Sequence, residues 1–576
     1  MKFSHLASYF EKIEKVSSRL AITSILAELF QKLSPQELEK TVYLLQGRVV
    51  PAFKSIDFGM AEKTIVKAII SALNIDKQYF DREAQKRGDL GEVTEFFKKQ
   101  YVSFEEKDLS ILETFNALYK LATSGGIGSQ EFKINTLSYL IRQLDALSSR
   151  YLVRIPQAKM RLGFSDMTVL DAYSWMITGD KSLRGTIEQA YHVRPDLGFI
   201  GKVLKEKGIK AMEKIQPVIF TPIIMMRAER LSSGEEIVKQ IGKCAIEPKY
   251  DGFRLQVHFK KGEVHLYSRS LEDVTYMYPD VVEGVLKEVD AKDAIFEGEA
   301  IGFEPISGNF LPFQETVQRK RKYDIASKAK EIPLKLFVFE LLYADGTNYI
   351  HEPFIKRREK LEKMLKITGN LVADMVVLAP HEIMSEPKKI EDNFDDAISR
   401  GLEGIIAKKL DGVYQPGARG WNWIKFKRSY SSKIEDTIDC VVMGYDAGKG
   451  KRAQFGIGAF LVGVFDDVKE QYVTLAKIGT GLTDDEWKEL FRRSQNLKVR
   501  SKPSEYLVDK MMECDVWLTP QTIVEIKADE ITRSPVHTAN LALRFPRLER
   551  FRDDKTVNDI TTFIEVQKMF KVQEKE

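Results

Sequence analysis

The stretch EPKYDGFRLQVHF, residues 247–259, brings together residue types that could form a covalent site. Lys249 stands before an Asp-Gly step, and Arg254 opens a run of alternating polar and apolar residues that is typical of a strand. A lysine attacks only when it is deprotonated, and partial burial together with neighbouring cations lowers its pKa. The chemistry predicted for Lys249 is attack on an α-phosphate, which gives a phosphoramidate. A K-x-D-G sequence alone is more often a surface turn, so the prediction depends on further residues.

Basic residues that could hold phosphates recur in the same half of the chain. The sequence has no G-x-x-x-x-G-K-[ST] motif, whose backbone amides cradle phosphates, so side chains must hold them. We favour basic residues on or beside predicted strands, because a sheet face next to an apolar core holds them in place. These are Lys249, Arg254, Arg269 in YSRS, Lys408 in EGIIAKK, Arg419 in PGARG, and Lys425 and Lys427 in WIKFK.

Two acidic sequences accompany these cations. In FEGEA, Glu297 and Glu299 share one face of a predicted strand across Gly298, where a ligand or another backbone can approach. Glu403 opens EGIIAKK with the same order of acid, glycine and strand. Hard carboxylates beside phosphates are typical ligands of Mg²⁺ or Mn²⁺, and we expect Glu299 and Glu403 to hold such a metal.

The elements that must position these residues form three regions. Apolar residues at helical spacing predict helices through most of residues 1–210. Strands alternate with helices over about 231–430, where RLQVHF and EVHLYSR predict a hairpin. Short strands with glycine-rich turns follow and are typical of a small barrel. We therefore expect an all-α domain over 1–215, an α+β domain with antiparallel sheets over 216–432, and a β-barrel with a C-terminal helix over 433–576.

Composition is that of a soluble globular protein, with a net charge of +4, 43% hydrophobic residues and 30% charged residues. Three widely spaced cysteines suit a reducing cytosol and form neither a disulfide framework nor a zinc site; Cys244 is expected to be a buried thiol. The N-terminus has no apolar core of a secretory signal, and no apolar run approaches the ~20 residues of a membrane span. We expect no membrane partner and a cytoplasmic location, at the nucleoid if the source is prokaryotic.

These motifs occur in one order, and in that order they resemble the nucleotidyltransferases that become adenylylated on lysine. The resemblance is specifically to the ATP-dependent DNA ligases of the archaeal and eukaryotic replicative type. EPKYDGFR resembles the lysine motif of that family. The motifs that follow it in the family are matched in order by SRSLEDVT, FEGEA, FVFELLYADG, LEGIIAKK and WNWIKFK. LRFPRLERFRDDK resembles the closing motif. SSRYLVRIPQAKMRLGFSDMTVLDA resembles part of the family's helical DNA-binding domain, so the resemblance covers nearly the whole chain.

The resemblance implies a fold and an activity. The three regions would be an all-α DNA-binding domain, an α+β adenylation domain with antiparallel sheets, and a C-terminal OB-fold (oligonucleotide-binding) β-barrel. The activity would be sealing of 5′-phosphate/3′-hydroxyl nicks in duplex DNA through enzyme-lysine-AMP, in replication, repair and recombination, with ATP and Mg²⁺ or Mn²⁺ as cofactors. Nicked double-stranded DNA is the implied partner, a sliding clamp is a further candidate partner, and a monomer is the expected state.

Residue roles follow from positions in the matching motifs. Lys249 would carry AMP. Glu247 would contact the adenine amino group, and Phe339 would stack on the base. The remaining contacts would be made to ribose and phosphate by Arg254, Arg269 and Glu299, and to the phosphates by Arg419, Lys425 and Lys427. Arg544, Arg552 and Lys555 of the closing motif would orient the leaving pyrophosphate, and Lys133, Arg154, Lys159 and Arg161 would contact DNA. The sequence departs from the family at Glu297 and Glu340, where aspartate is usual, and this substitution could alter metal geometry.

Three other functions compete with this interpretation. RNA ligases and mRNA-capping guanylyltransferases share the lysine motif, but the long helical region before Lys249 argues against both. A non-catalytic DNA clamp or scaffold on an inactive ligase core would require a broken site, whereas Lys249, Glu299 and Lys425 are all present. Detection of lysine-bound AMP would distinguish the enzymes from the scaffold.

Overall fold

The computed structural model describes residues 1–100, 106–304, 310–311, 313–321, 323–370, 373–400, 402–427, 437–448 and 455–575. The chain divides into two compact units, each described by itself below. The first comprises Met1–Glu229, Asp251–Pro380 and Lys408–Trp423, and the second comprises Arg230–Tyr250, His381–Ala407 and Ile424–Glu576. The predicted boundary at 432/433 lies outside the described residues, and the division into three domains stays a prediction. No helix in the described part of the chain is long and apolar enough to cross a membrane.

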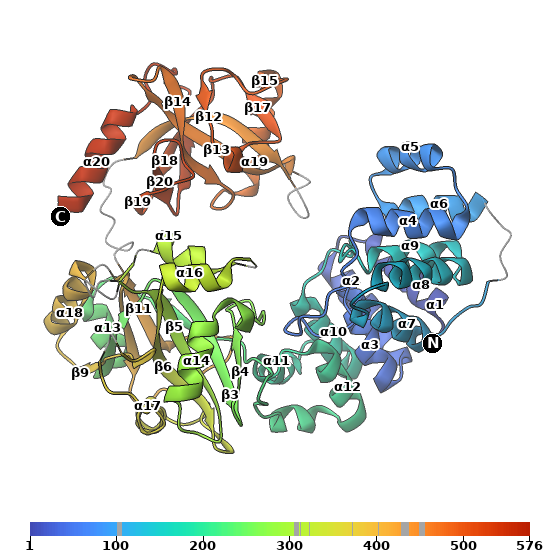
Figure 1. Ribbon diagram of the computed structural model, residues 1–576, viewed down its shortest axis with the longest axis horizontal. Helices are drawn as coiled ribbons and strands as arrows, with labels where there is room; N and C mark the ends of the chain where they lie inside the picture. The colour runs from blue at the N-terminus through green and yellow to red at the C-terminus, as the bar shows by residue number, and fades with distance from the viewer. Residues whose placement is uncertain are drawn as a thin grey trace. The chain divides into compact units, whose positions relative to one another are not determined.

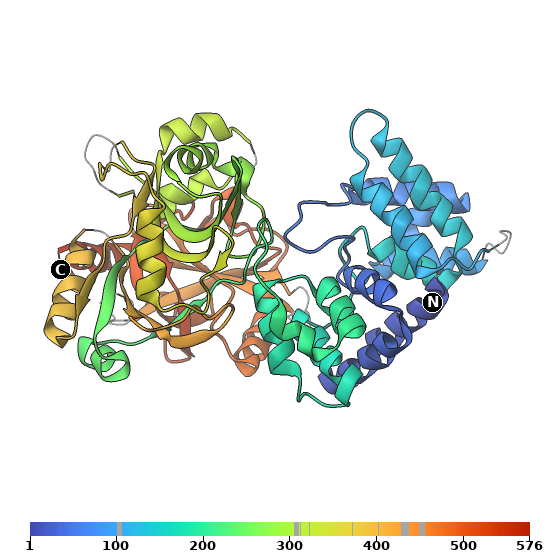
Figure 2. The ribbon, with the colours of Figure 1, turned by 90° about the horizontal axis from the view of Figure 1, so that it is seen from below.

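The first unit begins with the predicted helical region, which Figures 1 and 2 draw in blue to teal. Ser34 and Glu37 form a reciprocal capping box at the start of one of its helices, as expected where S-x-x-E precedes an apolar run. The helices are α1 (Phe3–Glu14), α2 (Arg19–Lys32), α3 (Pro35–Leu45), α4 (Glu62–Leu73), α5 (Lys77–Arg87), α6 (Leu90–Gln100), α7 (Ile111–Thr123), α8 (Ser129–Gln143), α9 (Ala146–Arg154), α10 (Asp166–Thr178), α11 (Arg184–Val193) and α12 (Leu197–Lys207).

The same unit contains a mainly antiparallel sheet in the order β4-β3-β5-β6-β7, with β8 beside β6. Its strands are β3 (Phe253–Lys260), β4 (Glu263–Tyr267), β5 (Asp293–Gly302), β6 (Leu334–Ala344), β7 (Thr347–Asn348) and β8 (Val376–Leu378), and its helices are α14 (Pro279–Glu288), α15 (Phe313–Thr316), α16 (Ile325–Glu331) and α17 (Phe354–Lys363). The predicted hairpin of β3 and β4 is confirmed, with Gln256 opposite Tyr267.

Alternation along β3 separates an apolar face from a polar one. Leu255 and Val257 enter a core with Val281 of α14, whereas Arg254, Gln256 and His258 lie on the other face. In the register, Arg254 is opposite Glu299 and Gln256 is opposite Glu297 on β5. The sheet therefore brings the predicted basic and acidic residues to one face.

A five-stranded sheet in the order β1-β11-β10-β2-β9 carries Lys249 at the end of β2. Its strands are β1 (Arg227–Arg230), β2 (Cys244–Lys249), β9 (Glu382–Met384), β10 (Gly404–Lys409) and β11 (Arg419–Lys427), accompanied by α13 (Gly234–Ile241) and α18 (Pro387–Ser399). Strands β10 and β11 pass from one unit into the other. The predicted burial of Cys244 is confirmed.

The C-terminal β region is organised around β12 (Ile438–Ala447), which pairs with β13, β17 and β18. Bulges in the β12–β13 pairing bend this sheet, which curls as the barrel prediction requires. Its other elements are β13 (Ile457–Asp466), β14 (Gln471–Ile478), β15 (Lys498–Val499), β16 (Tyr506–Leu507), β17 (Val516–Leu518), β18 (Ile523–Lys527), β19 (Glu530–Arg533), β20 (Leu541–Arg544), β21 (Arg547–Phe551), α19 (Asp484–Ser494) and α20 (Phe563–Lys575). The predicted fold class is confirmed.

Gly404 is the glycine that lets β10 begin directly after Glu403. Its φ is +144°, and a Cβ there would lie 2.2 Å from the Phe426 carbonyl oxygen. We expect Gly404→Ala to cost about 2–4 kcal/mol and to lower the Tm by several degrees, because rigid backbone causes the clash. Gly185→Ala is the control, since Gly185 lies in α11 and an added methyl group would have nothing within 4 Å. Equal Tm values for both variants, measured by differential scanning calorimetry, would contradict this account.

Candidate active site

One carboxylate holds the predicted nucleophile and a second lysine. Glu403 forms ion pairs with Lys249 and Lys427, the latter at 3.0 Å, and its N–H donates to the Lys249 carbonyl oxygen at 3.0 Å. Burial would raise the pKa of the Glu403 carboxyl, but the two lysines outweigh it and lower the pKa to about 2. Lys249 is therefore fixed by its own backbone and by an acid that stays ionised at neutral pH.

Lys425 lies on β11 near Lys249 and Lys427, and its pKa is lowered, as expected where cations cluster. Burial, followed by the positive charges of Arg230, Lys249 and Lys427, lowers its pKa to about 8. Its charge thus depends on pH within the range in which enzymes are commonly assayed. Lys425, a candidate phosphate-binding residue of the sequence analysis, thus lies within electrostatic reach of Lys249 in the structure.

Arg254 forms an ion pair with a fully buried carboxylate, that of Glu297. Its Nη2 lies 2.6 Å from Glu297 Oε2, and its Nη1 donates to the Met226 carbonyl oxygen at 2.8 Å. Glu297 also accepts hydrogen bonds from Gln256 Nε2 at 3.1 Å and from the Tyr414 hydroxyl at 3.1 Å. Glu297 is entirely inaccessible to solvent. Its longer side chain, where aspartate is usual, therefore serves to fix Arg254.

Glu340, the other departure from the family pattern, is also occupied by an arginine. Arg357 Nε and Nη2 lie 2.7 and 2.9 Å from the two Glu340 oxygens, and both residues are 1% exposed. This bidentate pair is a structural ion pair in the interior of the first unit. Arg357 also donates to the Gly412 carbonyl oxygen at 2.8 Å, which ties the segment after β10 to β6.

Phe339, the predicted base-stacking residue, lies among aromatic rings and cations. Its ring meets that of Trp423 edge-on, with centroids 6.1 Å apart. The Arg254 guanidinium lies 5.5 Å from the Phe339 centroid, and Lys408 Nζ donates to the Phe339 carbonyl oxygen at 2.7 Å. Lys408 is only 1% exposed, so it positions Phe339 and is not the phosphate contact that the sequence predicted.

The remaining predicted nucleotide-binding residues differ in exposure. Arg269 and Arg419 are exposed, Glu299 is half-buried and Glu247 is 2% exposed. Within the described residues, no group of three or more His, Cys, Asp or Glu side chains could hold a metal ion. Glu403, one of the two expected metal ligands, is paired with lysines instead. A metal would therefore need oxygen ligands from a substrate in addition to protein carboxylates.

The basic residues of the closing motif are each paired with an acid of the same β region. Arg544 lies 2.9 Å from Glu530, Arg552 lies 3.0 Å from Asp439, and Lys555 lies 2.6 Å from Asp439. Arg552 and Lys555 thus converge on one carboxylate, although they are separated by two residues in sequence. Asp439 was not identified from the sequence, because it lies more than a hundred residues before the motif.

The four predicted DNA contacts separate into two buried and two exposed residues. Lys133 is 6% exposed and donates to the Phe58 carbonyl oxygen at 2.7 Å. Arg154 is inaccessible and binds Glu14 and Asp89. Neither can reach a phosphate in this structure, so these two predictions are corrected to structural roles. Lys159 and Arg161 are exposed, although Arg161 also pairs with Asp89 at 2.9 Å.

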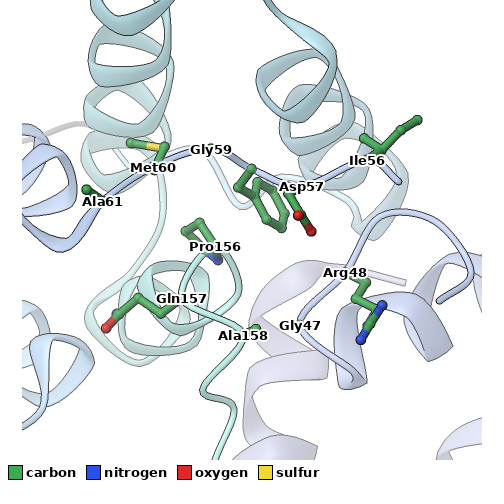
Figure 3. Close-up of a pocket in the computed structure, with 11 residues that line it drawn as sticks. Gly47, Arg48, Ile56, Asp57, Gly59, Met60, Ala61, Pro156, Gln157 and Ala158 are labelled. Atoms are coloured by element: carbon green, nitrogen blue, oxygen red, sulfur yellow. The ribbon is translucent and has the colours of Figure 1, made fainter. Parts of the chain in front are cut away.

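A pocket of about 400 Å³ lies against the segment that leads to Lys159 (Figure 3). It is lined by residues 47–48, 56–61 and 156–158, and none of the predicted nucleotide-binding residues lines it. A Cβ on Gly47 would lie 2.8 Å from the Cα of Ala158, so the missing side chain permits this close approach. The pocket belongs to the helical region and its exposed charges are Arg48 and Asp57.

Comparisons with known proteins cover the whole chain. Family models match as the DNA ligase N terminus over residues 2–174, the ATP dependent DNA ligase domain over 225–427, and the ATP dependent DNA ligase C terminal region over 453–555. The chain is 46% identical to a "Probable DNA ligase" of Dictyoglomus thermophilum and 38% identical to a "DNA ligase" of Sulfurisphaera tokodaii; each match spans 100% of this chain and 98% of that protein. A solved structure named "Pmar-Lig_Pre" shares the fold, with a TM-score of 0.54, 18% identity, and coverage of 95% of this chain and 99% of that chain.

The lowered pKa of Lys425 predicts a pH-dependent affinity for a triphosphate. Above about pH 8 the free lysine loses its charge, so affinity for a non-hydrolysable ATP analogue should fall as pH rises from 7.5 to 9.5, by up to ~10-fold per pH unit. Lys425→Arg keeps the charge and should remove most of this decline, because arginine stays protonated. Isothermal titration calorimetry of both proteins measures this, and a wild-type affinity that is constant over this range would contradict the role of Lys425.

Proposed function

Because this chain belongs to the ATP-dependent DNA ligase family, whose members seal nicks in DNA through an adenylate intermediate, we propose that Lys249 is the residue that carries AMP. The observation that supports this role most directly is the Lys249–Glu403–Lys427 cluster at the end of β2. It holds one amine in place by an ionised acid and surrounds it with further cations. A triphosphate bound there would meet a nucleophile and positive charges that attract its own negative charges.

The proposed reaction has three steps. The Lys249 nitrogen, having lost its proton, forms a bond to the α-phosphorus of ATP while the bond to the bridging oxygen of the β-phosphate breaks, and pyrophosphate leaves with the electron pair. AMP then passes from Lys249 to the 5′-phosphate of the nick, which regenerates the amine. Finally the 3′-hydroxyl attacks that phosphorus and loses its proton, AMP leaves, and a phosphodiester joins the strands.

The other residues of the matching motifs are proposed to support these steps by holding and neutralising charge. We propose that Lys425, Lys427 and Arg419 bind phosphates, and that Arg254, fixed by Glu297, contributes to binding of the ribose and phosphate. Phe339 would stack on adenine and Glu247 would accept a hydrogen bond from its amino group, while Arg269 and Glu299 complete the ribose and phosphate contacts. Arg544, Arg552 and Lys555 would act on the pyrophosphate.

Mg²⁺ or Mn²⁺ is the proposed metal, with Glu299 and Glu403 as its protein ligands. Mg²⁺ commonly binds one or two carboxylates and completes its shell with water and substrate phosphates, and Glu403 would have to exchange a lysine partner for the metal to serve as a ligand. When bound, the metal supplies positive charge against the phosphates. We further propose that the chain acts in the cytoplasm as a monomer on nicked duplex DNA, with a sliding clamp as a candidate partner.

Lys249→Ala should abolish AMP attachment and the sealing of nicks with ATP, because the first two steps use its nitrogen. Sealing of a nick that already carries 5′-AMP should remain within about tenfold of wild type, since the third step does not need this amine. Gel assays with labelled ATP and with pre-adenylylated DNA separate the two activities. Lys243→Ala, an exposed lysine just before β2, is the control and should behave as wild type. Normal labelling of the Lys249→Ala variant would disprove the assignment.

The helical region is proposed to bind duplex DNA through phosphate contacts and without sequence preference. Lys159→Ala should weaken binding to random-sequence duplex, and should reduce the slope of log affinity against log salt by about 1. Lys133→Met should instead lower the Tm and leave that slope unchanged, because Lys133 is buried against Phe58. Fluorescence anisotropy at several salt concentrations tests both variants, and an unchanged slope for Lys159→Ala would remove this residue from the interface.

A further inference from the structure

Asp439 joins the two cations at the end of the closing motif. Arg552 Nη1 lies 3.0 Å from Asp439 Oδ1, and Lys555 Nζ lies 2.6 Å from Asp439 Oδ2. Asp554 binds Nε and Nη2 of Arg552 at 2.8 and 2.7 Å, and Glu525 lies 3.4 Å from its Nη1. The carboxylates thus hold one edge of the guanidinium and one proton of the ammonium group.

The position of Asp439 is set by backbone hydrogen bonds. Its N–H donates to Thr561 Oγ1 at 3.0 Å, and its carbonyl oxygen accepts from the Thr561 N–H at 3.0 Å. It also stands opposite Glu525 in the β12–β18 pairing. Because it is 8% exposed and clamped on both sides of its Cα, Asp439 is a fixed anion to which two long, flexible side chains are attached.

Both cations retain donors that these contacts do not use. A guanidinium has five N–H donors and an ammonium group has three. Arg552 engages acids through Nε, through Nη1, which faces both Asp439 and Glu525, and through Nη2, which leaves one N–H on Nη2; Lys555 has two protons beyond its bond to Asp439. A further anion can therefore bind to this pair without breaking the bonds to Asp439.

We propose that Asp439 is a positioning residue for the first step: it holds Arg552 and Lys555 side by side so that their remaining donors bind the departing pyrophosphate. The inference rests on the proposed function of the closing motif and names the residue that orients it. Two adjacent cations repel each other, and each long side chain loses rotamer entropy when it is ordered. A fixed carboxylate between them offsets both effects before the nucleotide arrives, which is how preorganised donors gain their effect on a developing charge.

Asp439→Asn tests this inference because asparagine keeps the shape and one acceptor but removes the charge. The rate of AMP attachment should fall about tenfold, less than the ~100-fold loss typical when a preorganised donor itself is removed. In the reverse reaction, pyrophosphate attacks the lysine-bound AMP and ATP leaves. The pyrophosphate concentration that gives half the maximal rate of this reaction should rise. Sealing of a pre-adenylylated nick should stay within about twofold, and Asp439→Glu, which restores the charge, should recover part of the lost rate.

Asp466→Asn is the matched control, since Asp466 is a 2% exposed acid of the same β region that binds Lys469 at 3.4 Å and two backbone amides. It should leave both the attachment rate and the pyrophosphate dependence unchanged. A double-mutant cycle adds a second readout: Arg552→Ala should cost less in the Asp439→Asn background than in wild type, because the two residues act together.

Two outcomes overturn the inference. One is an Asp439→Asn variant that attaches AMP at the wild-type rate with an unchanged pyrophosphate dependence. The other is equal loss of attachment and of pre-adenylylated nick sealing, which indicates a general defect in the fold of the β region. If the wild-type protein itself formed no lysine-bound AMP, the proposed function would fail first, so the two failures are distinguishable.

Discussion

The polar face of the sheet formed by β3 and β5 depends on the ion pair between the buried carboxylate of Glu297 and Arg254. A charge with no solvent exposure is tolerated only when partners satisfy it, and Glu297 is satisfied by Arg254, Gln256 and Tyr414. These partners come from β3 and from the segment after β10, so the one acid connects elements that are far apart in the chain. Removing Arg254 would leave an uncompensated charge in the interior, and removing Gln256 or Tyr414 would leave the carboxylate with one hydrogen bond fewer. The orientation of Arg254 is therefore a consequence of how the sheet is held together.

A related arrangement occurs at two places where cations are proposed to meet phosphates. Glu403 holds Lys249 and Lys427, and Asp439 holds Arg552 and Lys555. In each case one fixed acid contacts two basic side chains and orders both. At Glu403 the two lysines leave positive charge in excess, whereas Asp554 and Glu525 also pair with Arg552. A substrate anion then completes an arrangement that already exists and does not have to collect flexible lysines from solvent. This lowers the reorganisation needed at each step.

Much of this organisation could be predicted from local sequence. Period-two alternation predicted the β3–β4 hairpin, and the acid–glycine–strand pattern placed Glu297 and Glu403 on strands or at their start. Motif order placed Lys249 beside cations, and the structure shows Lys425 and Lys427 there. These predictions succeeded because each depends on residues within one or two elements, where spacing determines which side chains share a face.

The residues that sequence reasoning missed act across long chain separations. Tyr414 reaches Glu297 over 117 residues, and Asp439 reaches Arg552 over 113, so no local pattern could have joined them. Charge alone was also a poor guide in the helical region, where Arg154 and Lys159 stand five residues apart yet differ in burial. Arg154 occupies a helix face that packs on Glu14 and Asp89, whereas Lys159 follows the end of that helix and faces solvent. Burial depends on packing between elements that are far apart in the chain, so a single sequence does not reveal which basic residues stay accessible to DNA.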